Sequence, residues 1–231
     1  MTQLQIGFLI YPGFVQLDVM GAYQVLAFPP NTQVHLIWKT LSAIASNEGL
    51  TLMPTTTFAD CPPLDVICVP GGGLGQVEAM KDRETLDFIQ QHSATAQYVT
   101  SVCTGSLILA AAGVLQGYKA TCHWALRDQL AMLGVEVVPQ RIAIDRNRVT
   151  GAGVTSGIDF GLTLLALLCG EEVAKMAQLM MEYNPEPPFN AGTPETAGEA
   201  IVQPFMQAGK PLLDAFQTQT TNTAAQLQLE T

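Results

Sequence analysis

One cysteine stands at a point in the chain where a thiol can act as a nucleophile. Cys103 follows an apolar, strand-like run over 98–102 and precedes a helical run over 107–112. At the start of a helix, unpaired backbone N–H groups and the helix dipole favour the thiolate. The second neighbours on both sides, Ser101 and Gly105, are small, as on a nucleophile elbow. A buried structural cysteine is the alternative, but the turn context favours a nucleophile.

A carboxyl group that can carry a proton follows another strand. Asp18 lies in the first turn of a helix predicted over 16–27, directly after a strand predicted over 5–11. Taken alone, an acid there is explained by the helix dipole. However, the carboxyl ends of parallel strands meet at one edge of a sheet, so Asp18 and Cys103 can lie together. Burial beside a thiolate would raise the pKa of Asp18 and let it hold a transferable proton.

Glycines follow a third apolar strand, in the segment 70–73. The segment matches neither the phosphate-binding loop nor the dinucleotide fingerprint. Glycine allows backbone N–H groups to point into a site, so Gly72 and Gly73 are predicted to bind an oxyanion or the substrate. The N–H of Thr104 would pair with that of Gly72, and the Thr104 hydroxyl can donate or accept a hydrogen bond. A simple loop and an ordinary helix cap are the alternatives.

No histidine stands next to the candidate nucleophile. His35 falls in a predicted strand and His92 on a helix face predicted to be exposed, so both are interpreted as structural. His123 follows a later strand and is given at most a supporting role near the site. The chemistry is therefore expected to depend on a thiol and a carboxylic acid. No spacing typical of metal ligands occurs, so neither a metal nor another cofactor is expected.

Composition limits the kinds of partner. The chain has 231 residues, of which 48% are hydrophobic and 13% charged, so a sizeable core is expected and apolar surface remains for contact between subunits. The formal net charge of −10 argues against binding to nucleic acid or an anionic membrane. Five cysteines without a CxxC pair indicate a reducing compartment. With no recognisable signal peptide and no long apolar span, a cytoplasmic location is expected.

Apolar runs of strand length alternate with helical patterns, which predicts an α/β fold with a mostly parallel sheet and helices on both faces. The segments 49–53 and 55–58 are interpreted as a short hairpin or an extended excursion. The predicted strands cover 5–11, 34–38, 65–69, 98–102, 119–121, 135–138, 141–144 and 149–150. The predicted helices cover 16–27, 123–133, 156–168 and 171–182, with another that begins near Arg83.

The character of the chain changes after Tyr183. The prolines of 184–188 end the preceding helix, and 195–206 is predicted as a further helix interrupted by Pro204. The segment 217–231 is either a final helix packed on a partner or a frayed tail. We therefore expect an α/β domain over 1–183 and a C-terminal extension over 184–231, packed on the same domain or on a partner subunit.

Four blocks of the sequence carry a family resemblance over about residues 4–183. They are YPGFVQLDVMGAYQVL, VPGGG, SVCTGSLILAAAGVLQGYKATCHW and TGAGVTSGIDFGLTLLALL. Together they resemble the DJ-1/PfpI superfamily and, within it, the isonitrile hydratase branch. The resemblance implies a flavodoxin-like α/β sandwich and a homodimer. It also implies a nucleophile at Cys103, an acid at Asp18 and a functional hydroxyl at Thr104.

The same resemblance implies a reaction. Isonitrile hydratases add water to an isonitrile to form an N-substituted formamide, which implies an isonitrile and water as partners and a covalent cysteine thioimidate. Peptidase-like relatives have a histidine where this chain has Thr104, which disfavours a protease. Regulators that share this core carry a basic DNA-binding extension, which is not expected here. Glyoxalase-like or amidase-like chemistry at the same cysteine, or a redox-sensing thiol, are the alternatives.

Overall fold

A seven-stranded sheet forms the centre of the computed structural model, which describes residues 3–229. The strand order is β10-β11-β7-β6-β1-β2-β5, and every neighbouring pair is parallel except β10 and β11. The strands are β1 (Leu4–Leu9), β2 (Thr32–Trp38), β5 (Thr56–Thr57), β6 (Val66–Val69), β7 (Tyr98–Val102), β10 (Ile142–Asp145) and β11 (Arg148–Gly151). The expected α/β fold with a mostly parallel sheet is confirmed.

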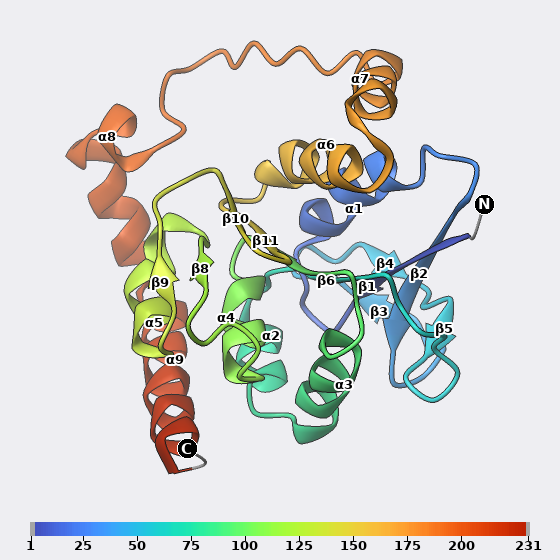
Figure 1. The fold of residues 1–231 in the computed structure, drawn as a ribbon. Coiled ribbons are helices and arrows are strands. Elements are labelled where there is room, and N and C mark those ends of the chain that lie inside the picture. The colour runs from blue at the N-terminus through green and yellow to red at the C-terminus, as the bar shows by residue number, and fades with distance from the viewer. Residues whose placement is uncertain (1–2, 230–231) are drawn as a thin grey trace.

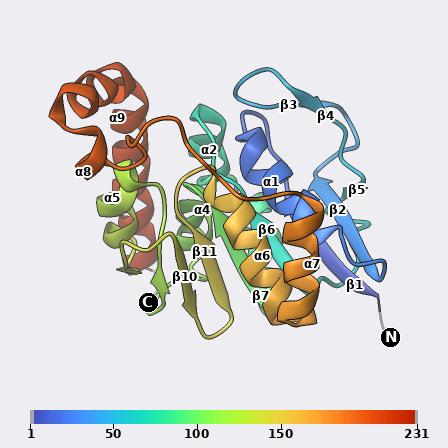
Figure 2. The same ribbon diagram turned by 90° about the horizontal axis from the view of Figure 1, so that it is seen from above.

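Helices cover both faces of this sheet (Figures 1 and 2). One layer contains α1 (Gln16–Leu26), α6 (Ser156–Cys169) and α7 (Glu171–Met180), and α1 packs closely against α6. The other layer contains α2 (Leu74–Ala79), α3 (Arg83–Ser93) and α4 (Gly105–Ala111). Because both faces of the sheet are covered, the central strands are apolar at successive positions and do not alternate between apolar and polar residues. Every residue of β6, for example, is buried.

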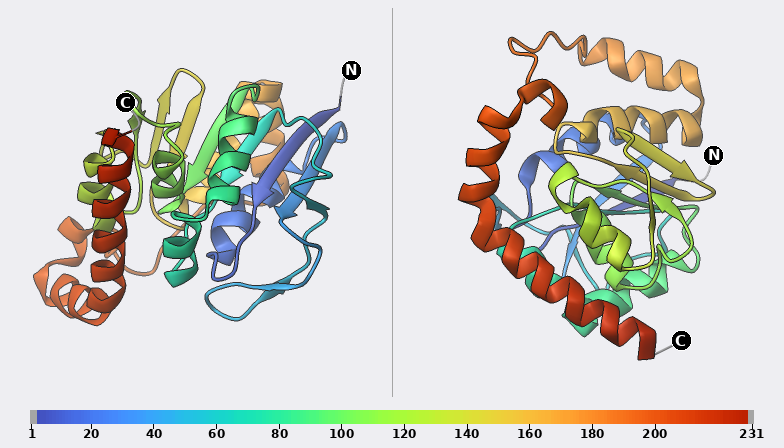
Figure 3. Two further views of the ribbon diagram at one scale, coloured as in Figure 1. Left: turned by 90° about the horizontal axis from the view of Figure 1, so that it is seen from below. Right: turned by 90° about the vertical axis from the view of Figure 1, so that its left-hand side faces the viewer.

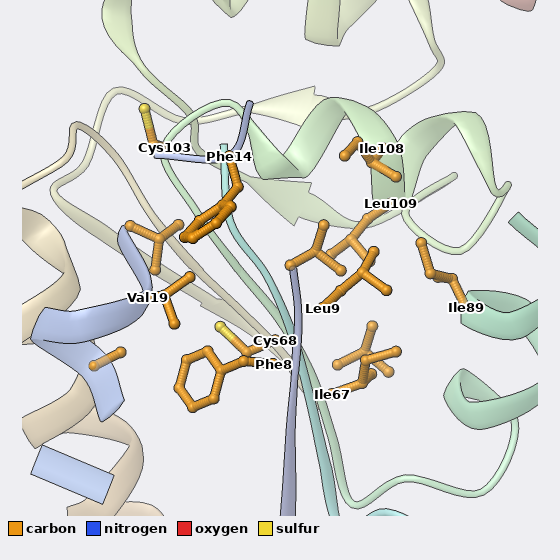
Figure 4. Packing of buried hydrophobic residues seen from close by; sticks show 14 of the residues in the cluster. Phe8, Leu9, Phe14, Val19, Ile67, Cys68, Ile89, Cys103, Ile108 and Leu109 are labelled. Carbon is orange, nitrogen blue, oxygen red and sulfur yellow. The ribbon is translucent and has the colours of Figure 1, made fainter. Parts of the chain in front are cut away.

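The core lies between the sheet and its helices. Figure 4 shows Phe8 and Cys68 of the central strands packed towards Val19 of α1, with Ile108 and Leu109 of α4 on the other side. The sulfur of Cys103 stands at the upper edge of this cluster and points away from its labelled neighbours (Figure 4). The core therefore holds the two helix layers on the sheet and leaves the end of β7 at its border.

Several short elements differ from the sequence-based expectation. The hairpin considered for 49–53 and 55–58 does not form: β4 (Thr51–Leu52) pairs with β3 (Ile44–Ala45), and β5 instead extends the central sheet. β8 (Lys119–Ala120) and β9 (Glu136–Val137) form a separate parallel pair. The helix predicted over 123–133 is a 3₁₀ turn, Trp124–Leu126, followed by α5 (Arg127–Met132). Local pattern does not specify which short segments pair, because tertiary contacts decide this.

The C-terminal segment forms a short helix, α8 (Pro194–Ala197), and a long one, α9 (Glu199–Leu229). The interruption predicted at Pro204 is wrong, because α9 continues through both Pro204 and Pro211. Each proline leaves a carbonyl four residues earlier without a partner, and both of those residues, Ala200 and Gln207, are exposed to water. The helix bends as it follows the molecule's side (Figure 3).

The long helix packs on the rest of the same chain. Contacts join α9 to α2, α4 and α5, and Phe216 and Thr220 of α9 are buried. Of the terminal segment predicted over 217–231, the last two residues lie outside the described part. Each helix between residues 3 and 229 is too short or too polar to span a lipid bilayer.

Candidate active site

Three segments that follow central strands meet at one edge of the sheet. Strands β1, β6 and β7 are hydrogen-bonded neighbours, and they lead to Asp18, Gly71 and Cys103 respectively. A side chain at Gly71 would have no room: its Cβ would lie 2.5 Å from Thr104 Oγ1 and 3.0 Å from Asp18 Oδ2. The carboxyl of Asp18 and the hydroxyl of Thr104 therefore approach each other over this glycine, at the end of the strands where such sheets bind ligands.

The backbone at Cys103 has the geometry of a nucleophile elbow. Its φ angle is 59°, in the left-handed region that residues other than glycine rarely adopt. A Cβ on Gly105 would lie 2.1 Å from the carbonyl oxygen of Val69, so the turn excludes any side chain at that position. Ser101 is fully buried, with its Oγ 2.8 Å from that of Ser106. Strain of this kind persists only where the surrounding structure enforces it.

Asp18 is a buried acid with an elevated pKa. Its side chain has no exposed surface, and Oδ2 accepts a 2.8 Å hydrogen bond from the backbone N–H of Gly71. Burial raises the pKa of Asp18 to about 7, although the hydrogen bond from Gly71 and the interaction with the Cys103 thiol lower it. Near neutral pH the carboxyl can therefore both give and take a proton.

Burial dominates the ionisation of the cysteine as well. Cys103 is 4% exposed, and burial raises its pKa well above the usual value, with the negative charge of Asp18 adding to the effect. The N–H of Thr104 at the start of α4 lowers the pKa, in the direction expected for a helix N-terminus, but by less. In the free protein the thiol is thus the favoured form, contrary to the sequence-based expectation of a thiolate.

A glutamine that the sequence analysis did not single out links the glycine loop to the elbow. Gln76 of α2 is fully buried, and its Oε1 accepts hydrogen bonds from Gly72 N–H, at 2.7 Å, and from the Thr104 hydroxyl. Its Nε2 donates to the carbonyl oxygen of Thr104 at 2.7 Å. The short helix α2 was not predicted, and without it no pattern places Gln76 beside the site.

This network contradicts the prediction that the backbone N–H of Gly72 helps to form an oxyanion hole. The N–H of Gly72 donates to Gln76 Oε1 and, at 3.3 Å, to Thr104 Oγ1, so it is not directed at a substrate. The N–H of Gly71 is likewise taken by Asp18. Gly72 and Gly73 line the cavity, and the N–H of Gly73 donates to the carbonyl oxygen of Gly13 at 3.1 Å, so neither glycine offers a free donor.

A cavity of about 210 Å³ opens beside Cys103 and Thr104. Its wall is largely apolar and comes from the elements around the elbow and from α9 of the same chain. The lining residues from α9 are Phe205, Gly209, Leu212, Leu213 and Phe216. The thiol is thus nearly buried yet borders a space that admits a small apolar molecule.

The three histidines lie in different surroundings. His123 lines the cavity, and burial lowers its pKa, so its ring is neutral. His92 is buried at 7% exposure against the ring of Phe88, which corrects the exposed position expected for it. His35 contacts Gln5 at 2.7 Å on the neighbouring strand. In the part of the chain that the structure describes, no three His, Cys, Asp or Glu side chains gather as metal ligands.

Tyr11 is a second buried neighbour that the sequence analysis did not identify. Its hydroxyl donates to the carbonyl oxygen of Pro70 at 2.9 Å. Burial raises the pKa of Tyr11, and the charges of Asp18 and Cys103 raise it further, so the phenol stays protonated. Tyr11 therefore holds the end of β6 in place rather than supplying a proton.

Comparison with known proteins agrees with this architecture. An isonitrile hydratase from Pseudomonas putida is 53% identical over 227 residues, which cover 98% of this chain and 99% of that protein. The crystal structure of a ThiJ/PfpI family protein from Pseudomonas syringae superposes with a TM-score of 0.92 at 42% identity, covering 95% of this chain and 91% of that one. The transcriptional regulator GbdR of Pseudomonas aeruginosa is 30% identical over 186 residues, covering 77% of this chain but 50% of the regulator.

The family model described as DJ-1/PfpI matches residues 5–167, which contain the central sheet, Asp18, the glycine loop and the elbow at Cys103. Drosophila melanogaster DJ-1beta has the same fold, with a TM-score of 0.73 at 20% identity over 80% of this chain and all of that one. The chain belongs to the DJ-1/PfpI family.

Proposed function

We propose that this protein is an isonitrile hydratase, a lyase that converts an isonitrile and water into an N-substituted formamide. The observation that carries the proposal is the 53% identity to the Pseudomonas putida isonitrile hydratase over nearly the full length of both chains. The site adds a chemical reason, because it combines a cavity-facing thiol with a buried acid whose pKa is about 7.

In the first step the sulfur of Cys103 attacks the terminal carbon of the isonitrile, R–NC. The isonitrile carbon accepts a nucleophile and a proton at the same atom. Asp18 supplies that proton, so a C–S bond and a C–H bond form and the product is a thioimidate, R–N=CH–S–Cys. The thiol and the carboxyl together contribute one proton in this step, whichever of them held it beforehand.

In the second step the ionised Asp18 takes a proton from a water molecule, whose oxygen attacks the thioimidate carbon. Asp18 passes this proton to the nitrogen. The C–S bond then breaks as the carbonyl forms, and the remaining hydroxyl proton returns to the Asp18–Cys103 pair, so R–NH–CHO is released and the pair again holds one proton. Covalent catalysis thus divides one difficult hydration into two easier steps. No oxyanion is present until water has added, which agrees with a site whose glycine N–H groups are already engaged.

The cavity supports a substrate with a small apolar substituent. Val15, Leu126 and Val154 line it together with the residues of α9, while the reacting groups lie at Cys103 and Thr104. The substituent R would lie against the apolar wall, with the isonitrile carbon towards the sulfur. Burial of apolar surface then provides most of the binding free energy.

Three features of the biological unit belong to the same proposal. We place the protein in the cytoplasm as a homodimer, in which exposed apolar side chains of α6 and α7, among them Leu167, Met176 and Leu179, are available for contact between subunits. We take residues 1–183 as the family domain and 184–231 as a C-terminal extension; the contacts of α9 with α2, α4 and α5 and its place in the cavity wall support this division.

The test is formamide production by the wild-type protein and by Cys103→Ala, with p-nitrophenyl isocyanide as substrate. The wild type should release the formamide and the variant should not. Methylglyoxal is assayed in parallel, because turnover of methylglyoxal without hydration of the isonitrile would favour the glyoxalase-like alternative. A thiol that is oxidised by peroxide while neither substrate reacts would favour a redox sensor.

A further inference from the structure

The side-chain amide of Gln76 forms hydrogen bonds with the catalytic elbow and the glycine loop. It is fully buried, and its partners are the N–H of Gly72 and both the hydroxyl and the carbonyl oxygen of Thr104. A buried glutamine is costly unless its polar atoms are satisfied, and here both ends of the amide are. These three hydrogen bonds hold the side chain in one position within the site.

The partners determine which way the amide faces. The N–H of Gly72 can only donate and the carbonyl oxygen of Thr104 can only accept. A reversed amide would place two donors together at Gly72 and two acceptors together at Thr104. Gln76 Oε1 must therefore face Gly72, and the Thr104 hydroxyl that reaches the same oxygen must be its donor.

We propose that Gln76 is a positioning residue: it accepts the hydrogen bond of the Thr104 hydroxyl, which withholds that proton from the Cys103 thiolate and leaves Thr104 Oγ1 as a hydrogen-bond acceptor for the reacting water. Oγ1 also accepts from Gly72 N–H at 3.3 Å, so its remaining capacity is for one further donor. For the hydration step this inference rests on the proposed function; the orientation of the hydroxyl does not.

The orientation of the Thr104 hydroxyl affects both steps of the proposed hydration. The Thr104 hydroxyl follows Cys103 directly in the chain and lines the same cavity, but its proton is donated to Gln76 Oε1 and is therefore withheld from the thiolate. In the second step Thr104 Oγ1 can accept from water while the carboxylate of Asp18 takes the proton. Two acceptors then orient one water molecule towards the thioimidate carbon.

The direct test measures alkylation of Cys103 by iodoacetamide as a function of pH, with the modified peptide quantified by mass spectrometry. In Gln76→Met the Thr104 hydroxyl is released and can donate to the thiolate. We expect roughly tenfold faster alkylation at a pH below the thiol pKa, the size of one hydrogen bond to a charged group. In a Thr104→Val background the same Gln76→Met change should have no effect. Unchanged alkylation, or equal acceleration in both backgrounds, would overturn the proposal.

A conservative variant and a matched control separate orientation from stability. Gln76→Glu, protonated because the position is fully buried, retains an acceptor oxygen for Gly72 and the Thr104 hydroxyl and a donor for the Thr104 carbonyl oxygen. It should therefore not accelerate alkylation, and acceleration would contradict the inference. Thr85→Val removes a buried hydroxyl of α3 that donates to Asp82, the residue before this helix, away from the site. It should lower Tm without changing alkylation or kcat. These two variants also keep the test informative if Gln76→Met folds poorly.

Activity provides the second measurement. In Gln76→Met, kcat for hydration of p-nitrophenyl isocyanide should fall about tenfold, because the Thr104 hydroxyl is no longer fixed as an acceptor for water, while KM changes little. The outcomes for this inference and for the proposed function are distinguishable. If the wild type hydrates no isonitrile but the alkylation pattern holds, the function is wrong and the role of Gln76 in orienting Thr104 stands.

Discussion

Oδ2 of Asp18 accepts a 2.8 Å hydrogen bond from the backbone N–H of Gly71, and this bond fixes the carboxyl at the end of β6. The same carboxyl interacts with the thiol of Cys103, which follows the adjacent strand β7. The acid is thus held by the backbone of one strand connection and faces the side chain of the next. Its position depends on the sheet rather than on a mobile side-chain partner.

The pH dependence of the reaction should report this pair. The pKa of Asp18 is about 7 and that of Cys103 is raised, so below pH 7 both groups are protonated. The reactive pair holds a single proton, and we expect kcat/KM to fall about tenfold per pH unit as the pH decreases below 7. A profile of kcat/KM between pH 5 and 9 measures this. A flat profile down to pH 5 would contradict the assignment.

Replacing Asp18 tests whether its carboxyl carries the proton that shapes the pH profile of kcat/KM. Asp18→Asn keeps an oxygen that can accept from Gly71 but cannot carry a proton. Its kcat should fall by roughly 100-fold or more, the usual contribution of a general acid and base, and the decline of kcat/KM near pH 7 should disappear. Wild-type kinetics in this variant would remove Asp18 from the mechanism.

The same substitution should stabilise the fold at alkaline pH. The pKa of Asp18 rises from 3.8 to about 7 on folding, so between these values the native state holds more protons than the unfolded state. Stability therefore decreases as the pH rises through this window, by up to about 4 kcal/mol at 1.36 kcal/mol per unit. Asp18→Asn removes that loss, so its Tm should exceed the wild-type value at pH 8 and approach it at pH 4. A lower Tm at pH 8 would show that the buried charge carries no such cost.

The cavity wall contributed by α9 offers a matched pair of aromatic residues. Phe216 is 1% exposed and Phe205 is 51% exposed, and both line the cavity. Phe216→Ala should cost about 3–5 kcal/mol of stability, whereas Phe205→Ala should cost under about 1 kcal/mol. Urea unfolding measures both.

Phe205→Ala also separates substrate binding from folding. We expect kcat/KM for an aryl isonitrile to fall by roughly tenfold while that for methyl isonitrile is unchanged, because only the larger substituent reaches α9. Equal losses for the two substrates would mean that this helix does not contact the substituent.

The sequence predicted the central features because they depend on local pattern. Continuous apolar runs identified β1, β6 and β7, and the small residues around Cys103 identified the elbow. The meeting of Asp18 with the elbow followed from the rule that parallel strands end at one edge. These inferences require only chain order and residue type.

Features that depend on long-range packing were not predictable in this way. The hydrogen bonds of Gln76 join α2 to the elbow across 28 positions of sequence, and no periodicity indicates them. The elevated pKa of Cys103 results from burial, which outweighs the favourable helix N-terminus, and local sequence does not show how deeply a side chain is buried. The continuous course of α9 through Pro204 depends on exposed carbonyls that water can satisfy.

The most direct measurement is mass spectrometry of the protein mixed briefly with p-nitrophenyl isocyanide. We expect the Cys103-containing peptide to gain the full mass of the isonitrile, because formation of the thioimidate loses no atoms, and we expect this adduct to decay as formamide appears. Cys103→Ser should show neither adduct nor turnover. Hydration by Cys103→Ser at the wild-type rate, or formamide release without any adduct at position 103 on the timescale of turnover, would contradict covalent catalysis by this thiol.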